Sequence, residues 1–241
     1  MTIKDYNDVP TNIVRKIATG GTATTFILDT RPRKTLKVFK DNKLTKMIYK
    51  MHKDYREYVR FLEGINDDSL VVPDTLYYDE KDILRAYEYP YVDGLTISSL
   101  HPKIQVESFI KALDSFKKSI EEISKYLVLH DLHHNNVVYT GKAIKLIDLD
   151  LYAINEKTRE IAIYKNRAQF NRAILKNVIS DVCLEVVVED QNLRRLYMLC
   201  DDGTIDVVEF LETFKDYLEE RVEPIKYLRD FGRTSKKARK W

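Results

Sequence analysis

The sequence predicts an α+β fold with a β-rich N-terminal part and a mainly helical C-terminal part. In the first 92 residues, short apolar runs typical of strands alternate with turn residues. Beyond residue 105, apolar residues recur at three- and four-residue steps, as in amphipathic helices. A length of 241 residues fits two small lobes that share a cleft, or one large domain.

Composition narrows the class of protein. Hydrophobic residues make up 44% of the chain and charged residues 32%, with a formal net charge of +2. These values exclude an intrinsically disordered chain, a collagen-like repeat and a global charge that would attract nucleic acid. No apolar run approaches the roughly 20 residues that cross a bilayer, and the N-terminal segment lacks the apolar core of a secretion signal. We therefore expect a cytoplasmic protein without a membrane partner, in which Cys183 and Cys200 are buried thiols rather than a disulfide or a metal site.

The N-terminal part is predicted to hold five strands and one helix. The adjacent pair Gly20-Gly21 marks a tight turn in a chain that has 7 glycines, because glycine adopts turn conformations at little steric cost. The stretch 44–62 has no Gly or Pro and places apolar residues at helical steps, so it predicts a helix. The predicted strands are 13–14, 26–28, 36–39, 70–72 and 83–91, the last ending at the turn signal 92–94.

The C-terminal part is predicted to be helical apart from one hairpin. A helix over 105–126 presents apolar residues on one face, and helices predominate from residue 168 onward. Apolar runs at 137–139 and 144–147 flank a glycine turn and predict the hairpin. The chain ends in a basic run, 233–241, which we expect to be a solvated tail.

Oxygen-bearing side chains gather around this hairpin. Asp131 and Asn136 lie in the run His-Asp-Leu-His-His-Asn-Asn that precedes it, and Asp148 follows it. Mg²⁺ takes hard oxygen ligands and is usually held by one or two carboxylates together with substrate phosphates, a role that Asn136 and Asp148 would suit. Asp131 could then orient an attacking hydroxyl. Aspartate and asparagine also gather in loops because they form turns, so this motif alone does not decide between the two interpretations.

The spacing of these residues resembles that of the protein-kinase-like superfamily. Asp131-x-x-x-x-Asn136 followed by Asp148 looks like its catalytic loop and its metal-binding Asp-Phe-Gly segment. Lys37, in Thr-Leu-Lys-Val, resembles the strand lysine that contacts the α- and β-phosphates of ATP. The resemblance implies that Asn136 and Asp148 hold Mg²⁺ and that Asp131 is the catalytic base.

The resemblance also implies an ATP site in the N-terminal part. Residues 17–26 resemble a degenerate glycine-rich loop, and the segment 89–94 looks like the interlobe hinge whose backbone binds adenine. Glu57 is similar to the helix glutamate that pairs with the catalytic lysine, and Lys40 with Glu63 is the fallback pair. The residues that the resemblance assigns to ATP are Gly20, Gly21, Lys37, Pro90 and Val92.

The sequence departs from ordinary protein kinases at several positions. His130 stands where they carry an arginine that reads a phosphorylated activation loop, and no Ala-Pro-Glu segment follows Asp148. His133 stands where protein Ser/Thr kinases carry a lysine, and it resembles the catalytic loop of aminoglycoside and choline phosphotransferases. Asp150 replaces the glycine of Asp-Phe-Gly and could be a second metal ligand or a turn residue.

The resemblance implies a bilobal protein-kinase-like fold with a nucleotide-binding N-lobe over 1–92, a catalytic C-lobe over 93–232 and the basic tail. The expected activity is transfer of the γ-phosphoryl group of Mg-ATP to a hydroxyl by an atypical protein Ser/Thr kinase of bacterial or phage type. The alternatives are a small-molecule or RNA kinase of the aminoglycoside-phosphotransferase type and a pseudokinase that binds nucleotide without turnover. The sequence does not define the acceptor.

Two other motifs have simpler interpretations. Residues 200–209 imitate the second half of an EF-hand, but hard oxygen ligands are missing from the first half, so we predict a turn with Asp206 starting the next helix. The basic tail could hold RNA, although we do not expect binding of nucleic acid through it. Thr234 and Ser235 are predicted to be exposed there, and to be the sites of any autophosphorylation.

Overall fold

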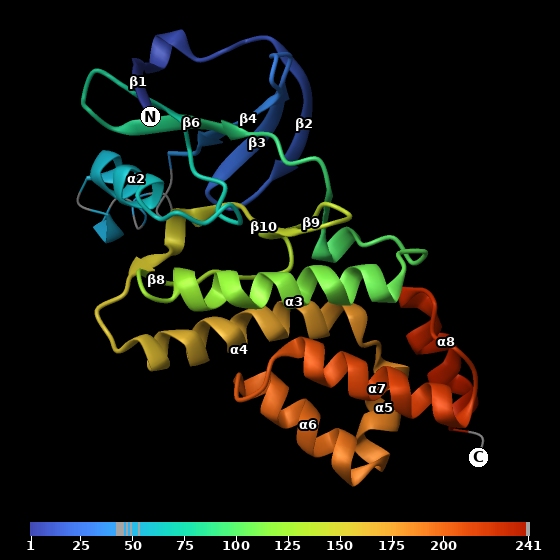
Figure 1. The fold of residues 1–241 in the computed structure, drawn as a ribbon. Coiled ribbons are helices and arrows are strands. Elements are labelled where there is room, and N and C mark those ends of the chain that lie inside the picture. Colours follow the sequence, from blue (N-terminus) through green and yellow to red (C-terminus); the bar gives the residue numbers. More distant parts are fainter. Residues whose placement is uncertain (42–45, 47, 49, 53, 240–241) are drawn as a thin grey trace. The chain divides into compact units, whose positions relative to one another are not determined.

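The computed structural model describes residues 1–41, 46, 48, 50–52 and 54–239 (Figure 1). The chain divides into two compact units. Unit 1 comprises Met1–Asp93 together with Asp148–Leu151, and unit 2 comprises Gly94–Ile147 together with Tyr152–Trp241. Among the described residues, no helix combines the length and the apolar character that crossing a membrane requires.

Unit 1 is built on a six-stranded sheet. Its strands are β1 (Thr2–Asp5), β2 (Ile13–Thr19), β3 (Ala23–Leu28), β4 (Lys34–Phe39), β5 (Thr75–Tyr78) and β6 (Leu84–Pro90). They lie in the order β1-β5-β6-β4-β3-β2, with all neighbours antiparallel except the parallel pair β1 and β5. One face of the sheet buries a cluster of Leu28, Leu36, Tyr77 and Ala86. This face forms because inward side chains alternate along each strand.

The strands differ from the prediction at two places. β1 was not predicted, because all four of its residues are exposed and show no apolar alternation. The prediction of a strand at 70–72 is wrong. Leu70 is a single bridging residue, and regular strand pairing starts only at Thr75, beyond Pro73. Proline has no N–H to donate to a sheet, so the apolar run before it ends without forming a strand.

Helix α2 (Tyr55–Glu63) packs on unit 1 through an apolar stripe of Tyr55, Tyr58, Val59 and Leu62. The prediction of one helix over 44–62 is wrong within the described residues, because Asp54 has an extended backbone and caps the start of α2. Its carboxylate accepts a hydrogen bond from the N–H of Arg56 at 2.8 Å. Residues 46, 48, 50 and 51 are helical, and the rest of the predicted range before Asp54, apart from His52, lies outside the described residues.

Unit 2 is mainly helical. Its helices are α3 (Val106–Ile123), α4 (Arg159–Val178), α5 (Asp181–Glu189), α6 (Gln191–Asp202), α7 (Val207–Arg221) and α8 (Leu228–Ala238). Short strands β7 (Leu95–Thr96), β9 (Val137–Tyr139) and β10 (Ile144–Leu146) form one small sheet, and β8 (Leu127–Val128) pairs with β11 (Ala153–Ile154). The predicted hairpin is confirmed by the antiparallel pairing of β9 and β10.

The turn between α6 and α7 confirms a helix connection rather than an EF-hand. Gly203 ends α6 with a φ of +91°, and a Cβ atom there would lie 2.5 Å from the carbonyl oxygen of Tyr164. Only glycine tolerates both the conformation and the contact. Asp206 caps α7 as predicted, because its carboxylate accepts the N–H groups of Val208 and Glu209. Cys183 and Cys200 are free and buried, also as predicted.

The predicted solvated tail is wrong for residues 233–238, because they belong to α8. Thr234 and Ser235 are both fully buried, at 0% exposure. The expectation that they are exposed autophosphorylation sites is therefore also wrong, since a hydroxyl that is closed off from solvent cannot enter a kinase active site. Small hydroxyl side chains fit here because they lie on the face of α8 that packs into unit 2.

Candidate active site

Lys37 is the centre of a buried polar cluster in unit 1. It lies on β4, inside the sheet, and its side chain is 5% exposed. Its Nζ donates to the Asp150 carboxylate at 2.6 Å and also contacts the Asp148 carboxylate. The rings of Phe39 and Tyr87 flank the ammonium group, with centroids at 5.6 and 5.7 Å. Burial alone would lower the pKa of Lys37, but Asp150 and Asp148 raise it above its ordinary value, so the amine stays charged.

Asp150 is held by donors on both of its oxygens. Oδ2 accepts the hydrogen bond from Lys37, while Oδ1 accepts from the hydroxyls of Tyr55 and Tyr87, the latter at 2.9 Å. Burial would raise the pKa of Asp150, but Lys37 and the two tyrosine hydroxyls hold it below its ordinary value. The residue is 2% exposed. Asp150 is therefore a buried counter-charge to Lys37, and its saturated oxygens do not suit a metal ligand.

Side chains from α2 and that of His52, two residues before the cap of α2, bind the backbone of the segment 148–151. The hydroxyl of Tyr58 donates to the carbonyl oxygen of Leu149 at 2.8 Å. A ring nitrogen of His52 lies 2.7 Å from the carbonyl oxygen of Asp150, and this ring stacks on Tyr58 with centroids 3.8 Å apart. These contacts fix the 3₁₀ turn η3 (Leu149–Leu151) and, with it, the carboxylates on either side of Leu149.

Asp148 has a strained backbone and an accessible carboxylate. Its φ is +59°, in the left-handed region that costs a non-glycine residue about 1 kcal/mol. Its side chain is 37% exposed, unlike that of Asp150. Partial burial raises the pKa of Asp148, Lys37 opposes this rise and Asp150 adds to it, so that the net change is upward. Strain of this kind persists where surrounding contacts hold it, and it is typical of functional sites.

Glu57 does not join this cluster. Its side chain is exposed on α2, and within the described residues Lys37 pairs with Asp148 and Asp150 instead. The reason is helical phase: the buried stripe of α2 starts at Tyr55 and continues at Tyr58, so residue 57 points away from the sheet.

The fallback pair of Lys40 and Glu63 does not form either. Glu63 binds the N-terminal amine at 2.8 Å. Lys40 donates to the carbonyl oxygen of Gly20. Asp150 therefore holds the place at Lys37 that the sequence assigned to Glu57.

The other residues assigned to ATP also lie in unit 1. Gly20 and Gly21 form the exposed turn between β2 and β3, where the Gly20 N–H donates to the carbonyl oxygen of Ala23 at 2.9 Å. A Cβ at Gly20 would meet only that oxygen, at 3.8 Å, so the turn leaves space beside its backbone. Pro90 ends β6, paired with Lys34 of β4, and Val92 follows it, half-buried.

Asp131 and Asn136 lie in unit 2, in the loop between β8 and β9. The Asp131 carboxylate is 41% exposed, with Nε2 of His133 at 3.8 Å. Asn136 is 5% exposed and closes the loop: its Nδ2 donates to the Asp131 carbonyl oxygen at 3.0 Å, and its N–H donates to the His133 carbonyl oxygen at 2.8 Å. Because Nδ2 is engaged, Oδ1 is the remaining polar atom of the amide.

Asn166 of α4 supports this loop and was not predicted. It is fully buried, its Oδ1 accepts the N–H of Leu129 at 2.8 Å, and its Nδ2 donates to Leu127 O and Ser124 Oγ, each at 2.9 Å. A polar residue on the apolar face of a helix was the available signal, since Ala162 and Phe170, four residues away on either side, are both buried. Asn166 is a positioning residue for the segment that leads into Asp131.

We expect Asn166→Ala to lower the free energy of unfolding by about 2–4 kcal/mol, because the buried N–H of Leu129 and carbonyl of Leu127 lose their partner. Urea denaturation followed by circular dichroism measures this. Asn177→Ala is the matched control on the same helix, since Asn177 is exposed and donates only to its own helix, to Ala173 O. Equal losses in the two variants would contradict a supporting role for Asn166.

Asp148 and Asn136 each carry an oxygen of the kind that Mg²⁺ binds. Asp148 offers an accessible carboxylate and Asn136 an amide oxygen, and Mg²⁺ is usually bound by few protein oxygens together with substrate phosphates. Within the described part of the chain, no group of three or more His, Cys, Asp or Glu side chains could hold a metal ion. The predicted ligands belong to different units, Asp148 to unit 1 and Asn136 to unit 2.

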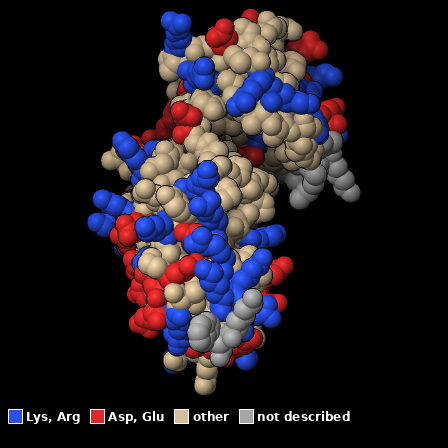
Figure 2. Space-filling view, turned by 90° about the vertical axis from the view of Figure 1, so that its right-hand side faces the viewer, with Lys and Arg blue, Asp and Glu red and all other residues tan. Residues whose placement is uncertain are grey.

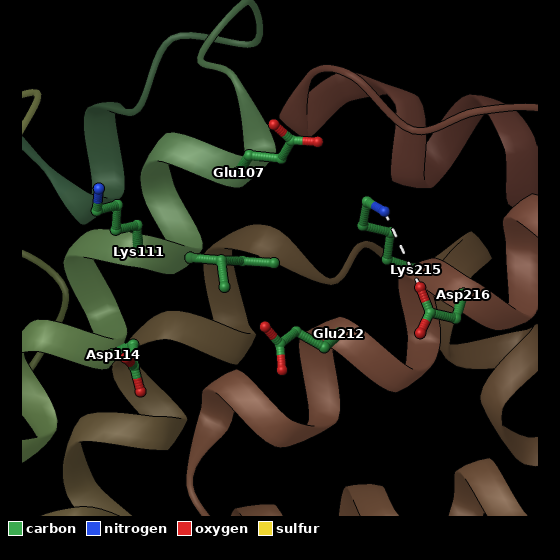
Figure 3. A pocket seen from close by; sticks show the side chains of 7 residues that line it. Glu107, Lys111, Asp114, Glu212, Lys215 and Asp216 are labelled. Atoms are coloured by element: carbon green, nitrogen blue, oxygen red, sulfur yellow. Dashed lines mark ion pairs between the residues drawn. The ribbon is translucent and has the colours of Figure 1, made fainter.

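A polar groove of about 430 Å³ lies between α3 and α7 of unit 2 (Figure 3). Its charged side chains come from both helices, and Lys215 lies 3.9 Å from Asp216 and 2.8 Å from Glu219. None of the residues predicted for ATP, metal or catalysis lines it. The lining residues are Glu107, Ile110, Lys111, Asp114, Glu212, Lys215 and Asp216. This groove is not part of the candidate active site.

Comparison with known proteins identifies the fold. No family model and no curated protein sequence matches the chain. Among solved structures, that of the apo GRMZM2G135359 pseudokinase matches with a TM-score of 0.56 at 11% sequence identity. The match covers 100% of this chain and 94% of that one. The chain therefore has a protein-kinase-like fold, with a β-rich N-terminal unit and a helical C-terminal unit.

Proposed function

We propose that the chain is an ATP-dependent phosphotransferase that moves the γ-phosphoryl group of Mg-ATP to a hydroxyl. The observation that carries this proposal is the charged Lys37, buried between Asp148 and Asp150. A buried ammonium group is costly unless it is paired, and here the pairing leaves one accessible carboxylate, that of Asp148, beside it. This arrangement suits a lysine that contacts phosphate oxygens next to a metal-binding carboxylate.

Each residue has a defined role in this proposal. Lys37 would bind the α- and β-phosphates, with Asp150 rather than Glu57 orienting its amine. Asp148 and Asn136 would hold Mg²⁺, which when bound offsets the charge on the phosphates. Asp131 would accept the proton of the acceptor hydroxyl, a role that its 41% exposed carboxylate allows. The glycine turn would let backbone N–H groups approach the triphosphate.

The acceptor class follows from weaker observations. Protein Ser/Thr hydroxyls are the acceptor we propose, as for an atypical protein kinase. The position of His133, 3.8 Å from the Asp131 carboxylate, favours the alternative of a small-molecule or RNA acceptor, since an imidazole beside the base replaces the lysine of protein kinases.

A second candidate is a nucleotide-binding pseudokinase. It is favoured by the contact between Lys37 and Asp148, which occupies an oxygen of the proposed metal ligand. It gives no reason for an exposed carboxylate at Asp131, because a module that only binds nucleotide has no use for a base.

Incubation of the purified chain with γ-labelled ATP and Mg²⁺ tests the proposal. Panels of proteins, aminoglycosides, sugars and RNA serve as acceptors. We expect transfer of label to one panel, and that panel identifies the acceptor class. Tight Mg-ATP binding without transfer or hydrolysis would support the pseudokinase, and the absence of both binding and transfer would contradict both candidates.

We expect Asp148→Asn to weaken Mg-dependent ATP binding by at least about tenfold, because the negative charge that would attract the cation is lost. Asparagine also tolerates the left-handed backbone at this position, so the variant isolates the charge. Calorimetry with and without Mg²⁺ measures the change. Asp41→Asn, at an exposed carboxylate of unit 1, is the control. Unchanged affinity in Asp148→Asn would show that Asp148 is not a metal ligand.

A further inference from the structure

Helix α8 of unit 2 carries positive charge on one face only. Arg229, Arg233 and Lys236 follow each other at steps of four and three residues, which places them on one side of the helix. Phe231, Thr234 and Ser235 lie on the opposite side, at 1%, 0% and 0% exposure. The helix therefore buries its small and apolar residues in unit 2 and presents a row of cations to solvent.

A neighbouring segment of unit 2 extends this row. The N–H of Leu228 donates to Ile104 O at 3.0 Å, and the N–H of Arg229 donates to Pro102 O at 3.1 Å. The antiparallel pairing of Gln105 with Tyr227 fixes the register of the two segments. This register places Lys103 beside Arg229. We define the basic stripe as Lys103, Lys226, Arg229, Arg233 and Lys236, all of which are exposed.

Acidic residues neutralise only part of this charge. Over residues 226–239, Asp230 is the single acidic residue, and it is buried at 3% exposure. Its carboxylate accepts the N–H groups of Lys226 and Tyr227 and also lies 3.8 Å from Arg229 and 3.4 Å from Arg233. Glu223 pairs with Arg233 at 3.2 Å and with Lys237 at 2.7 Å. In the described part of the chain, Lys103, Lys226 and Lys236 have no ion pair.

Helix stability does not explain the whole stripe. Cations in the last turn, such as Lys236, interact favourably with the helix dipole. Arg229 lies in the first turn and Lys226 just before the helix, where positive charge opposes the dipole by about 0.3–1 kcal/mol. Arg229 has partners within the chain, Asp230 at 3.8 Å and the ring of Tyr227 at 5.3 Å. Lys226 has no ion pair among the described residues, so its charge points to a partner outside the chain.

Because α8 holds these cations in a row, we propose, against the expectation from the sequence alone, that the basic stripe binds the phosphodiester backbone of a nucleic acid. Figure 2 shows Lys and Arg side chains on the face of unit 2 that carries α8, with Asp and Glu side chains next to them. From Arg229 to Lys236 the row spans about 10 Å at 1.5 Å per residue, enough to meet successive phosphates, which lie about 3.4 Å apart per strand along a duplex. The stripe offers charge without a defined set of groups for reading bases, so the binding is independent of sequence.

The chemistry of the stripe favours nucleic acid over a protein or a membrane. Interfaces between proteins are anchored by aromatic and apolar side chains, and none of the exposed large apolar residues of the described chain lies in 101–105 or 226–239. A helix that binds a membrane surface inserts its apolar face, but α8 buries that face within unit 2. A phosphodiester backbone presents a regular row of negative charge, which complements a row of cations that has no apolar anchor.

Binding to labelled oligonucleotides tests the proposal without reference to phosphotransfer. We would measure anisotropy with single-stranded RNA, single-stranded DNA and duplex DNA of about 20 nucleotides or base pairs, from about 50 to 300 mM KCl. If all five cations of the stripe contact phosphates of a single strand, a plot of the logarithm of the association constant against the logarithm of the salt concentration should have a slope of about −3.5. The three probes show which nucleic acid binds best, and binding of any of them through the stripe supports the proposal.

The variant Lys226→Gln/Arg229→Gln/Lys236→Gln removes three charges from the stripe. We expect affinity at low salt to fall at least about tenfold and the slope to flatten by about 2, or 0.7 for each lost contact to a single strand. The matched control is Lys81→Gln/Arg194→Gln/Arg195→Gln, which removes the same charge at exposed positions outside the stripe. Control affinity should stay within about twofold of the parent. Circular dichroism melts verify that both variants fold.

Three outcomes would overturn the proposal. In the first, the parent chain fails to bind any oligonucleotide at low salt. In the second, the two triple variants weaken binding equally, which shows that binding depends on net charge and not on the stripe. In the third, the parent binds vesicles that contain phosphatidylserine but binds no oligonucleotide, which assigns the stripe to membrane lipid.

Discussion

An Asp131→Asn variant is expected to transfer the phosphoryl group about 10²–10⁴-fold more slowly than the parent, while its affinity for Mg-ATP stays nearly unchanged. The substitution removes the base but keeps the size of the side chain. The loop keeps its shape, because Asn136 binds the backbone carbonyl of Asp131 and not its carboxylate. Transfer of label from γ-labelled ATP gives the rate, and calorimetry gives the affinity.

Asp114→Asn is the control for this variant, since Asp114 is an exposed carboxylate of unit 2 outside the candidate active site. Its rate should equal that of the parent. If Asp131→Asn loses affinity to the same extent as rate, Asp131 is a structural or metal-binding residue. If it loses neither, the chain does not use this carboxylate as a base.

An Asp150→Ala variant is expected to lower the free energy of unfolding by about 3–5 kcal/mol. Removing one member of a buried ion pair leaves a charge without compensation, and here Lys37 would keep only Asp148. The hydroxyls of Tyr55 and Tyr87 would lose the acceptor that they share. Chemical denaturation followed by circular dichroism measures the change.

Two further variants make this result specific. Asp150→Asn keeps an oxygen for the tyrosine hydroxyls and should lose less stability than Asp150→Ala, by about 1 kcal/mol or more. Asp41→Ala removes an exposed carboxylate of unit 1 and should change stability by no more than about 0.5 kcal/mol. A loss below about 1 kcal/mol in Asp150→Ala would show that the cluster around Lys37 does not stabilise unit 1.

The sequence predicts the parts of the candidate site that depend on local pattern. The hairpin of β9 and β10 follows from apolar runs around a glycine turn. The partner of Lys37 could not be predicted in this way, because Asp150 lies 113 residues further along the chain and no local pattern links the two residues. Part of this error could be avoided from sequence, since the aromatic and apolar steps of α2 already turn residue 57 toward solvent.

The C-terminal helix shows a second limit of sequence patterns. A dense run of Lys and Arg is typical of a solvated tail, and that interpretation missed α8. The helical signal is present but weak, because Phe231 is the single large apolar residue among the buried positions of α8, and the others are Asp230, Thr234 and Ser235. β1 is missed for a related reason: its pairing with β5 involves backbone groups, while its side chains remain exposed.

Unit 1 is assembled from two separate stretches of the chain, Met1–Asp93 and Asp148–Leu151. During synthesis the first stretch emerges from the ribosome well before the second, at a rate of about 5–20 residues per second. Until residue 151 has emerged, Lys37 has neither Asp148 nor Asp150 to compensate its charge. The N-terminal unit therefore cannot complete its interior as a nascent chain on its own, and a fragment that ends at Asp93 would lack an essential part of its own core.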